Sequence, residues 1–158
     1  MSVIFRKLLI YSMIFAFAFT SSILVSSKSA SAANREWVNL GKGYKAGFDE
    51  PHDKKTGKWH VHVYKGSKEI ASENMDGTKH DGSTLKKAPK SVVKTLKSKS
   101  QWGKYKKKQK KLEDARKNVS KFSWWQLVWD PTPIVTLAVA LGITFAMLTM
   151  AQWKAIIF

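Results

Sequence analysis

Residues 58–70 of this chain read KWHVHVYKGSKEI, and they show the clearest structural pattern in its 158 residues. The apolar side chains of Trp59, Val61 and Val63 alternate with more polar ones. A period of two is typical of a strand that buries one face, so we expect a strand here. The Lys-Gly-Ser sequence that follows predicts a turn, and residues 68–72 predict the returning strand of a β-hairpin.

The hairpin belongs to a small domain that we place at residues 33–102. Residues 37–40 have the composition of a further short strand, while the glycines after them loosen the chain. Ser83 or Thr84 can cap a helix around Val92. The expected fold class is therefore α+β, with a thin apolar core.

The first 32 residues, 1–32, have the three-part form of a secretory signal peptide. Two basic residues precede an uncharged run over residues 8–27, and small residues around Ala32 supply a cleavage pattern. The alternative is an uncleaved signal anchor, because the run is long enough to span a bilayer. Either form exports the residues that follow, so we expect residues 33–102 to form an extracytoplasmic domain.

Near the other end, residues 131–153 carry no charged side chain and predict one transmembrane helix. Aromatic side chains at both ends of this segment, with Lys154 after it, match the belts that proteins place at membrane interfaces. The expected interface residues are Trp124, Trp125, Trp129, Trp153 and Lys154. This arrangement predicts a single-pass protein of the cell membrane whose bulk faces outside after signal cleavage. A secreted product, whose tail inserts into a target bilayer from outside, is the alternative.

The segment between the two apolar ends is strongly basic, and the chain as a whole has a net charge of +17. Such a charge favours anionic partners, which outside a cell are membrane lipids or cell-wall polymers. Residues 103–130 predict a basic amphipathic helix beside the membrane, because apolar residues recur along one stripe. That stripe contains Tyr105, Leu112, Ala115, Val119, Phe122 and Trp129. A solvated helix that docks on the small domain is the alternative.

The composition argues against two classes of site. The chain contains no cysteine, which removes disulfides and thiolate chemistry. The glycine-rich residues 41–47 lack the spacing of a phosphate-binding loop, so we expect no nucleotide.

The histidines are the candidates for chemistry. His60, His62 and His80 can bind zinc or copper as a His-x-His pair with a third histidine. The same three residues can instead act as general base and general acid in phosphodiester cleavage, with Lys58 stabilising the phosphorane. In a third interpretation they are polar surface residues of the hairpin, since His60 and His62 point away from its apolar face, toward solvent or a second layer.

One series of short motifs is similar to a known class of module. Residues 59–64, WHVHVY, are followed by Asp-Gly at residue 76, His-Asp-Gly at residue 80 and Lys-Ala-Pro-Lys at residues 87–90. In this order they resemble small His-x-His hairpin modules of secreted bacterial polymorphic toxins and bacteriocin-like proteins. The resemblance implies an interbacterial effector and, with it, an immunity partner. The chain departs from such modules by carrying a membrane tail in place of a long delivery region.

Three functions follow from these patterns. The first is that of an exported, membrane-anchored cationic protein that binds anionic envelope polymers or lipids, without enzymatic activity and without a cofactor other than the zinc or copper considered above. The second is that of a bacteriocin-like membrane-active toxin. The third is that of a secreted ribonuclease-type toxin, which would act on RNA through His60, His62 and His80.

Overall fold

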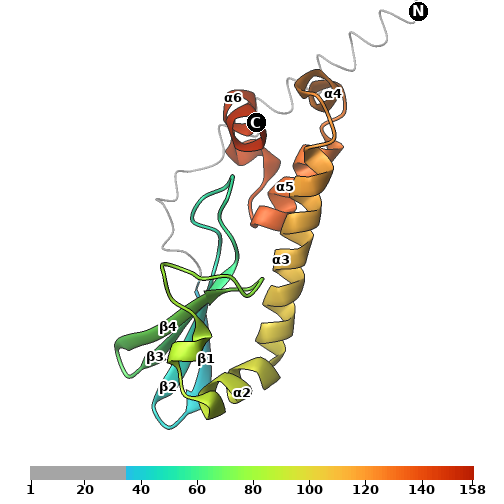
Figure 1. The fold of residues 1–158 in the computed structure, drawn as a ribbon. Helices are drawn as coiled ribbons and strands as arrows, with labels where there is room; N and C mark the ends of the chain where they lie inside the picture. Colours follow the sequence, from blue (N-terminus) through green and yellow to red (C-terminus); the bar gives the residue numbers. More distant parts are fainter. Residues whose placement is uncertain (1–34) are drawn as a thin grey trace, which may run out of the picture. The chain divides into compact units, whose positions relative to one another are not determined.

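The computed structural model of the protein describes residues 35–158 (Figure 1). Residues 1–34 lie outside this description, so the predicted signal peptide at residues 1–32 stays a prediction. Over the described residues the chain forms a four-stranded antiparallel sheet and five α-helices. The predicted α+β class is confirmed.

The sheet is a meander in which each strand pairs with the next one along the chain. Its strands are β1 (Glu36–Gly41), β2 (Tyr44–Asp49), β3 (His60–Lys65) and β4 (Lys68–Asn74). Gly66 lies in the β3–β4 turn at φ 60°, a left-handed conformation that glycine adopts without strain, and the predicted hairpin is confirmed. Strand β3 is flanked on both sides, so its first residue, His60, lies opposite Asp49 on β2 and Asn74 on β4.

Strand β2 is absent from the sequence-based prediction, which treats the glycine-rich residues 41–47 as a loose connection. Its sequence YKAGFD contains Ala46 and Gly47, and these small residues obscure the alternation. A side chain at Gly47 would clash, because the Arg35 side chain lies 2.5 Å from the position that a Cβ atom would take. Ala46 and Phe48 are fully buried, so β2 contributes to the core despite its weak pattern.

Helix α3 (Ser100–Val119) packs against the apolar face of the sheet. The ring of Tyr105 stacks on that of Phe48, with 4.6 Å between their centroids. Gln109 accepts a hydrogen bond from the backbone N–H of Trp59 at 2.9 Å. The predicted stripe is confirmed over this helix, where Tyr105, Leu112, Ala115 and Val119 are buried.

The chain reaches α3 through a 3₁₀ turn, η1 (Leu85–Lys87), and helix α2 (Lys90–Ser98). Thr84 caps η1 by accepting a hydrogen bond from the Lys86 N–H at 3.3 Å. Helix α2 begins directly after Pro89, whose fixed φ suits a helix entry. The prediction that Ser83 or Thr84 caps the helix around Val92 is therefore wrong, because Thr84 caps the separate turn η1 and α2 begins after Pro89 without a side-chain cap.

The basic helix expected over residues 103–130 is divided in the structure. Helix α3 ends at Val119, and a second helix, α4 (Trp124–Trp129), begins after a short turn. Ser123 and Gln126 form the capping box at its start. Because a capping box satisfies the free N–H groups of a first turn, this sequence favours a new helix over a continued one.

The apolar segment that follows is also divided. It consists of α5 (Thr132–Leu141), the 3₁₀ turn η2 (Phe145–Met147) and α6 (Met150–Ile157). Gly142 ends α5 at φ 79°, the left-handed conformation that favours glycine. Thr149 and Gln152 form the capping box that begins α6. The prediction of a single transmembrane helix over residues 131–153 is therefore wrong, and within the described part of the chain no helix is both long and apolar enough to cross a membrane.

Helices α5 and α6 extend the hydrophobic core. Helix α5 packs along α3, as Figure 1 shows, and Ile134, Leu137, Ala138 and Leu141 are buried. The Trp59 indole N–H donates a hydrogen bond to the Ala140 carbonyl oxygen at 3.1 Å, which ties α5 to the start of β3. The indole N–H of Trp153 in α6 donates to the carbonyl oxygen of Phe145 at 3.1 Å.

Candidate metal centre

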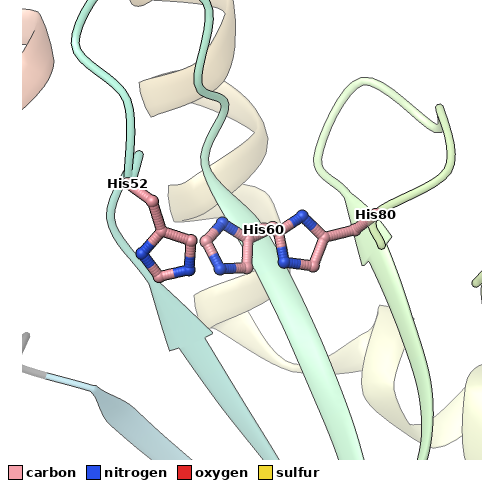
Figure 2. Close-up of side chains that lie close together, drawn as sticks. All are labelled: His52, His60 and His80. Atoms are coloured by element: carbon pink, nitrogen blue, oxygen red, sulfur yellow. The ribbon is translucent and has the colours of Figure 1, made fainter. Parts of the chain in front are cut away.

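Three histidines from separate parts of the chain meet at one end of the sheet (Figure 2). His60 is the first residue of β3, His52 lies in the loop after β2, and His80 lies in the loop after β4. The ring of His60 stacks on that of His80, with 3.8 Å between centroids, and lies 4.6 Å from that of His52. The rings of His52 and His80 are 6.0 Å apart, so His60 occupies the middle of a row.

The alternation of β3 places His60 and His62 on the face of the sheet opposite α3. His60 is fully buried and His62 is 8% exposed. The interpretation of these residues as polar surface side chains of a hairpin is therefore wrong. The loops that carry His52 and His80 bring their rings against this face and so provide the second layer that the sequence left open.

A tight turn fixes His80. Asp81 and Gly82 have φ values of 46° and 71°, and His80 and Ser83 exchange backbone hydrogen bonds across them at 3.1 and 2.9 Å. This is the Asp-Gly pattern of a type I′ turn, in which both central residues need positive φ. The Ser72 hydroxyl also donates to the carbonyl oxygen of His80 at 3.1 Å, which holds the turn against β4.

Each of two imidazoles is oriented by a hydrogen bond at Nδ1. His60 Nδ1 lies 2.9 Å from the Lys58 carbonyl oxygen, and His80 Nδ1 lies 3.2 Å from Oδ1 of Asn74. Because both of these oxygens can only accept, Nδ1 carries the proton in each neutral ring and Nε2 keeps its lone pair. Metal-ligating histidines show this arrangement, with one nitrogen on the ion and the other donating to a carbonyl or carboxylate oxygen.

The free nitrogens of these rings are buried and have no hydrogen-bond partner among the described residues: His60 Nε2, His80 Nε2 and both nitrogens of His62. The exposed carboxylate of Asp81 lies 3.3 Å from His80 Nε2 but does not form a hydrogen bond with it. A buried polar atom without a partner costs about 1–3 kcal/mol, so this concentration of them needs a physical explanation.

Burial also favours the neutral form of His60 and His80. Burial, with smaller contributions from the surrounding imidazoles, lowers the pKa of His60 to about 4. Burial likewise lowers the pKa of His80. Neutral imidazole is the form that coordinates a metal ion, so protons compete weakly for these nitrogens at neutral pH.

Two groups of side chains have the spacing of a metal site. The outer triad is His52, His60 and His80, and the inner triad is Asp49, His60 and His62; within each, the ligand atoms lie within 4.8 Å of one another. An ion bound at about 2.1 Å to each nitrogen needs them within about 4 Å of one another. The stacked rings of His60 and His80, which lie 19° from parallel, would have to rotate for both Nε2 lone pairs to point at one ion.

The inner triad is less available for an ion. The guanidinium of Arg35 binds the Asp49 carboxylate through Nε at 2.8 Å and through Nη2 at 2.7 Å. His62 lies between two carboxylates, with Nδ1 3.0 Å from an oxygen of Glu69 and Nε2 3.5 Å from an oxygen of Asp49, although neither contact has the geometry of a hydrogen bond. The outer triad also has carboxylates nearby, that of Asp81 at 3.3 Å from His80 Nε2 and that of Asp49 at 3.9 Å from His60 Nε2, but neither forms a hydrogen bond with these nitrogens. The outer triad also borders a pocket of about 290 Å³ that opens to solvent. We therefore take the outer triad as the candidate metal centre.

The structure brings together His60, His62 and His80 as the sequence analysis expects, and adds His52. No local pattern marks His52, because it lies in a loop whose path the sequence does not specify. Lys58 borders the same pocket, but its ammonium is paired with Asp76 at 2.6 Å, so its predicted role in stabilising a phosphorane stays a prediction.

The predicted interface residues are distributed unevenly. Trp125 and Trp129 are 71% and 79% exposed, and Trp124 is half-buried with Lys154 Nζ 6.0 Å from its ring. Trp153, in contrast, is fully buried, so its ring does not reach the surface where an interface residue is expected.

No family model, curated protein or solved structure matches this chain. The resemblance to toxin modules therefore stays a prediction. Function has to be inferred from the chemistry of the site itself.

Proposed function

We propose that this protein binds a zinc or copper ion at the outer triad, through Nε2 of His60, Nε2 of His80 and a ring nitrogen of His52. The observation that supports this proposal is the state of His60 and His80. Each has a buried Nε2 without a partner in the described chain and an Nδ1 that donates to an oxygen acceptor. An ion would satisfy the two free nitrogens and remove the cost of burying them.

The ligand set favours borderline transition metals over hard cations. Imidazole nitrogens suit zinc, copper and nickel, whereas calcium and magnesium take oxygen ligands. The net charge of +17 works against any cation, so binding must come from the three neutral donors held close together. Weak binding of magnesium is a direct consequence.

The coordination would be incomplete. Three protein ligands beside a solvent-accessible pocket leave a position for water or a small ligand, as in zinc sites with open coordination. Acid–base catalysis by the same histidines receives less support. A pKa of about 4 leaves His60 unprotonated at neutral pH, where a general acid must carry a proton.

We further propose that the protein acts outside the cytoplasm. The three-part sequence of residues 1–32 supports export. An extracytoplasmic metal-binding protein also fits a chain without cysteine, since imidazole is then the main nitrogen or sulfur ligand that the sequence offers.

Titration of the purified full-length chain, first treated with a chelator, tests the metal proposal. We expect one zinc or copper ion per chain by calorimetry, and no binding of magnesium at the same concentrations. His52→Ala and His80→Ala should each lower the affinity at least tenfold, while His62→Ala, which alters the inner triad alone, should change it less than about threefold.

Thermal denaturation of each variant shows whether it folds. Absence of a one-to-one complex with either metal would overturn the proposal. Equal affinity in His62→Ala and His80→Ala, or a larger loss in His62→Ala, would overturn the choice of the outer triad.

A further inference from the structure

A second and larger hollow lies between α3 and α5. It has a volume of about 800 Å³, which is within the range of about 300–1,000 Å³ that small-molecule sites occupy. Its apolar wall includes Trp59, Ala115, Val135, Val139 and Ala140. Both valines are open to solvent, with Val139 72% and Val135 40% exposed. This hollow, which we call the α3–α5 groove, is therefore an accessible apolar surface.

Lysines line one part of the groove and continue beyond it. Lys108 and Lys111 border the groove, and the same two residues border an adjoining hollow of about 480 Å³ together with Lys104 and Lys107. An apolar channel that runs into a cluster of ammonium groups has the chemical layout of an amphiphile with a negatively charged head.

Several of these ammonium groups lack an acidic partner. Lys104 pairs with Glu36 at 2.6 Å, but in the described part of the chain neither Lys107 nor Lys111 forms a salt bridge. Lys108 Nζ lies 4.1 Å from the centre of the Trp59 ring, held over its face in place of a carboxylate. The acidic group on the rim, Asp114, is paired with Lys110 at 3.0 Å, so its charge is largely compensated.

We propose that the α3–α5 groove binds an anionic membrane lipid, with an acyl chain along the apolar wall and a phosphate headgroup at Lys107, Lys108 and Lys111. Burial of the acyl chain against Val135 and Val139 contributes through the area removed from water, and each ammonium near the phosphate adds an electrostatic contribution. This site is separate from the metal centre and does not depend on it.

The surroundings of the groove fit contact with a lipid surface. Of the nine large hydrophobic side chains that are exposed among the described residues, all but Trp37 lie in α4, α5, η2, α6 or at the C-terminus. They are Trp125, Val128, Trp129, Val135, Val139, Met147, Met150 and Phe158. Trp125 and Trp129 are of the residue type that membrane proteins place at the headgroup level.

Dodecyl phosphate, used below its micelle concentration, is the first probe. We expect it to bind the full-length chain at least tenfold more tightly than neutral dodecyl maltoside, and inorganic phosphate at millimolar concentration should not displace it. Displacement by inorganic phosphate would mean that the acyl chain adds nothing to binding, and equal affinity for the neutral detergent would mean that the lysines add nothing. Either result would overturn the proposal.

Variants locate the site. Val139→Asp places a charge on the groove wall and should lower the affinity for dodecyl phosphate at least tenfold. Met147→Asp, a matched change at an exposed apolar residue outside the groove, should alter it less than twofold. Lys107→Glu with Lys111→Glu should also lower it at least tenfold, against no change for Lys86→Glu with Lys87→Glu. Equal effects of the groove and control variants would place the ligand elsewhere.

Vesicles test whether the ligand is a lipid in a membrane. Retention of the chain on phosphatidylglycerol vesicles should exceed that on phosphatidylcholine vesicles, and Val139→Asp should lower the difference at least threefold. If Val139→Asp weakens dodecyl phosphate binding but leaves vesicle retention unchanged, the ligand is a free amphiphile and the membrane lipid is excluded. His80→Ala should leave every one of these measurements unchanged, which separates them from the metal proposal.

Discussion

Both faces of the sheet are buried at β3, but burial stabilises the fold on one face and costs free energy on the other. On one face Val61 and Val63 are fully buried among apolar and aromatic neighbours, and each square ångström removed from water stabilises the fold by about 25 cal/mol. On the other face, ring nitrogens of His60 and His62 are buried and have no hydrogen-bond partner among the described residues. Burial on the first face thus reflects packing, whereas burial on the second is the observation on which the proposed metal site rests.

Truncation on the apolar face should give the largest effect. Phe48→Ala removes a fully buried ring that stacks on Tyr105, and we expect it to lower the free energy of unfolding by about 3–5 kcal/mol. Urea denaturation followed by far-UV circular dichroism measures this. A loss below about 1 kcal/mol would mean that the face is less well packed than its burial indicates.

Acidification should destabilise the face of the sheet that carries His60 and His62, which we call the imidazole face. The pKa of His60 is lowered from 6.5 to about 4, so between these values the unfolded chain takes up a proton that the folded chain does not. The free energy of unfolding of the metal-free protein should therefore be unaffected by this group above pH 6.5 and fall as the pH drops toward 4, by on the order of 3 kcal/mol. His60→Gln, which cannot titrate, should lose this part of the pH dependence. Parallel pH profiles for the two proteins would contradict the burial of a neutral His60.

Metal should offset the cost of the imidazole face. Zinc at about 100 times its dissociation constant should raise the free energy of unfolding by about 2.7 kcal/mol. Because His80→Ala should lower the affinity at least tenfold, the stabilisation in that variant should fall to about 1.4 kcal/mol or less, and magnesium should give none. A similar gain in His80→Ala would show that the ion binds elsewhere.

Asn74 should act as a positioning residue for the ion. Its Oδ1 lies 3.2 Å from His80 Nδ1, and its amide nitrogen donates to the Lys79 carbonyl oxygen at 2.7 Å, which fixes the side-chain orientation. Asn74→Ala should lower zinc affinity about tenfold, or about 1.4 kcal/mol. Asn74→Asp keeps an acceptor for His80 and should restore most of the affinity. Equal losses in both variants would indicate a structural role only.

An exposed polar contact gives the smallest effect and serves as the baseline. Lys104 pairs with Glu36 at 2.6 Å but is 53% exposed, so water screens the pair. Lys104→Ala should change the free energy of unfolding by less than about 1 kcal/mol. A larger loss would mean that this exposed ion pair stabilises the fold more than its screening by water allows.

The sequence predicts three strands of the sheet, β1, β3 and β4, and misses the inner strand β2. The alternation of residues 59–63 identifies β3 because side chains on that strand are large and differ sharply in polarity. The same rule fails for β2, where Ala46 and Gly47 have too little side chain to reveal a pattern. The Arg35 side chain takes the space beside Gly47, but Arg35 lies just before β1, so no local pattern around Gly47 reveals it.

The apolar tail shows a different limitation. Mean composition over residues 131–153 predicts one spanning helix, but Gly142 and the capping pair Thr149 and Gln152 are stop and start signals that divide it. These signals are readable from the sequence and outweigh composition here. The candidate metal centre is only partly readable, because His52 joins it through the path of a loop and not through periodicity.

The three imidazoles of the metal centre are scattered along an unfolded chain, and the turn at Asp81 and Gly82 has to close beside β4 before the last of them arrives. An unfolded chain therefore offers an ion no preassembled set of ligands. If the chain is exported unfolded, as the predicted signal peptide implies, the proposed site would be loaded after translocation. The metals dissolved at the destination, and not those of the cytosol, would then determine which ion it binds.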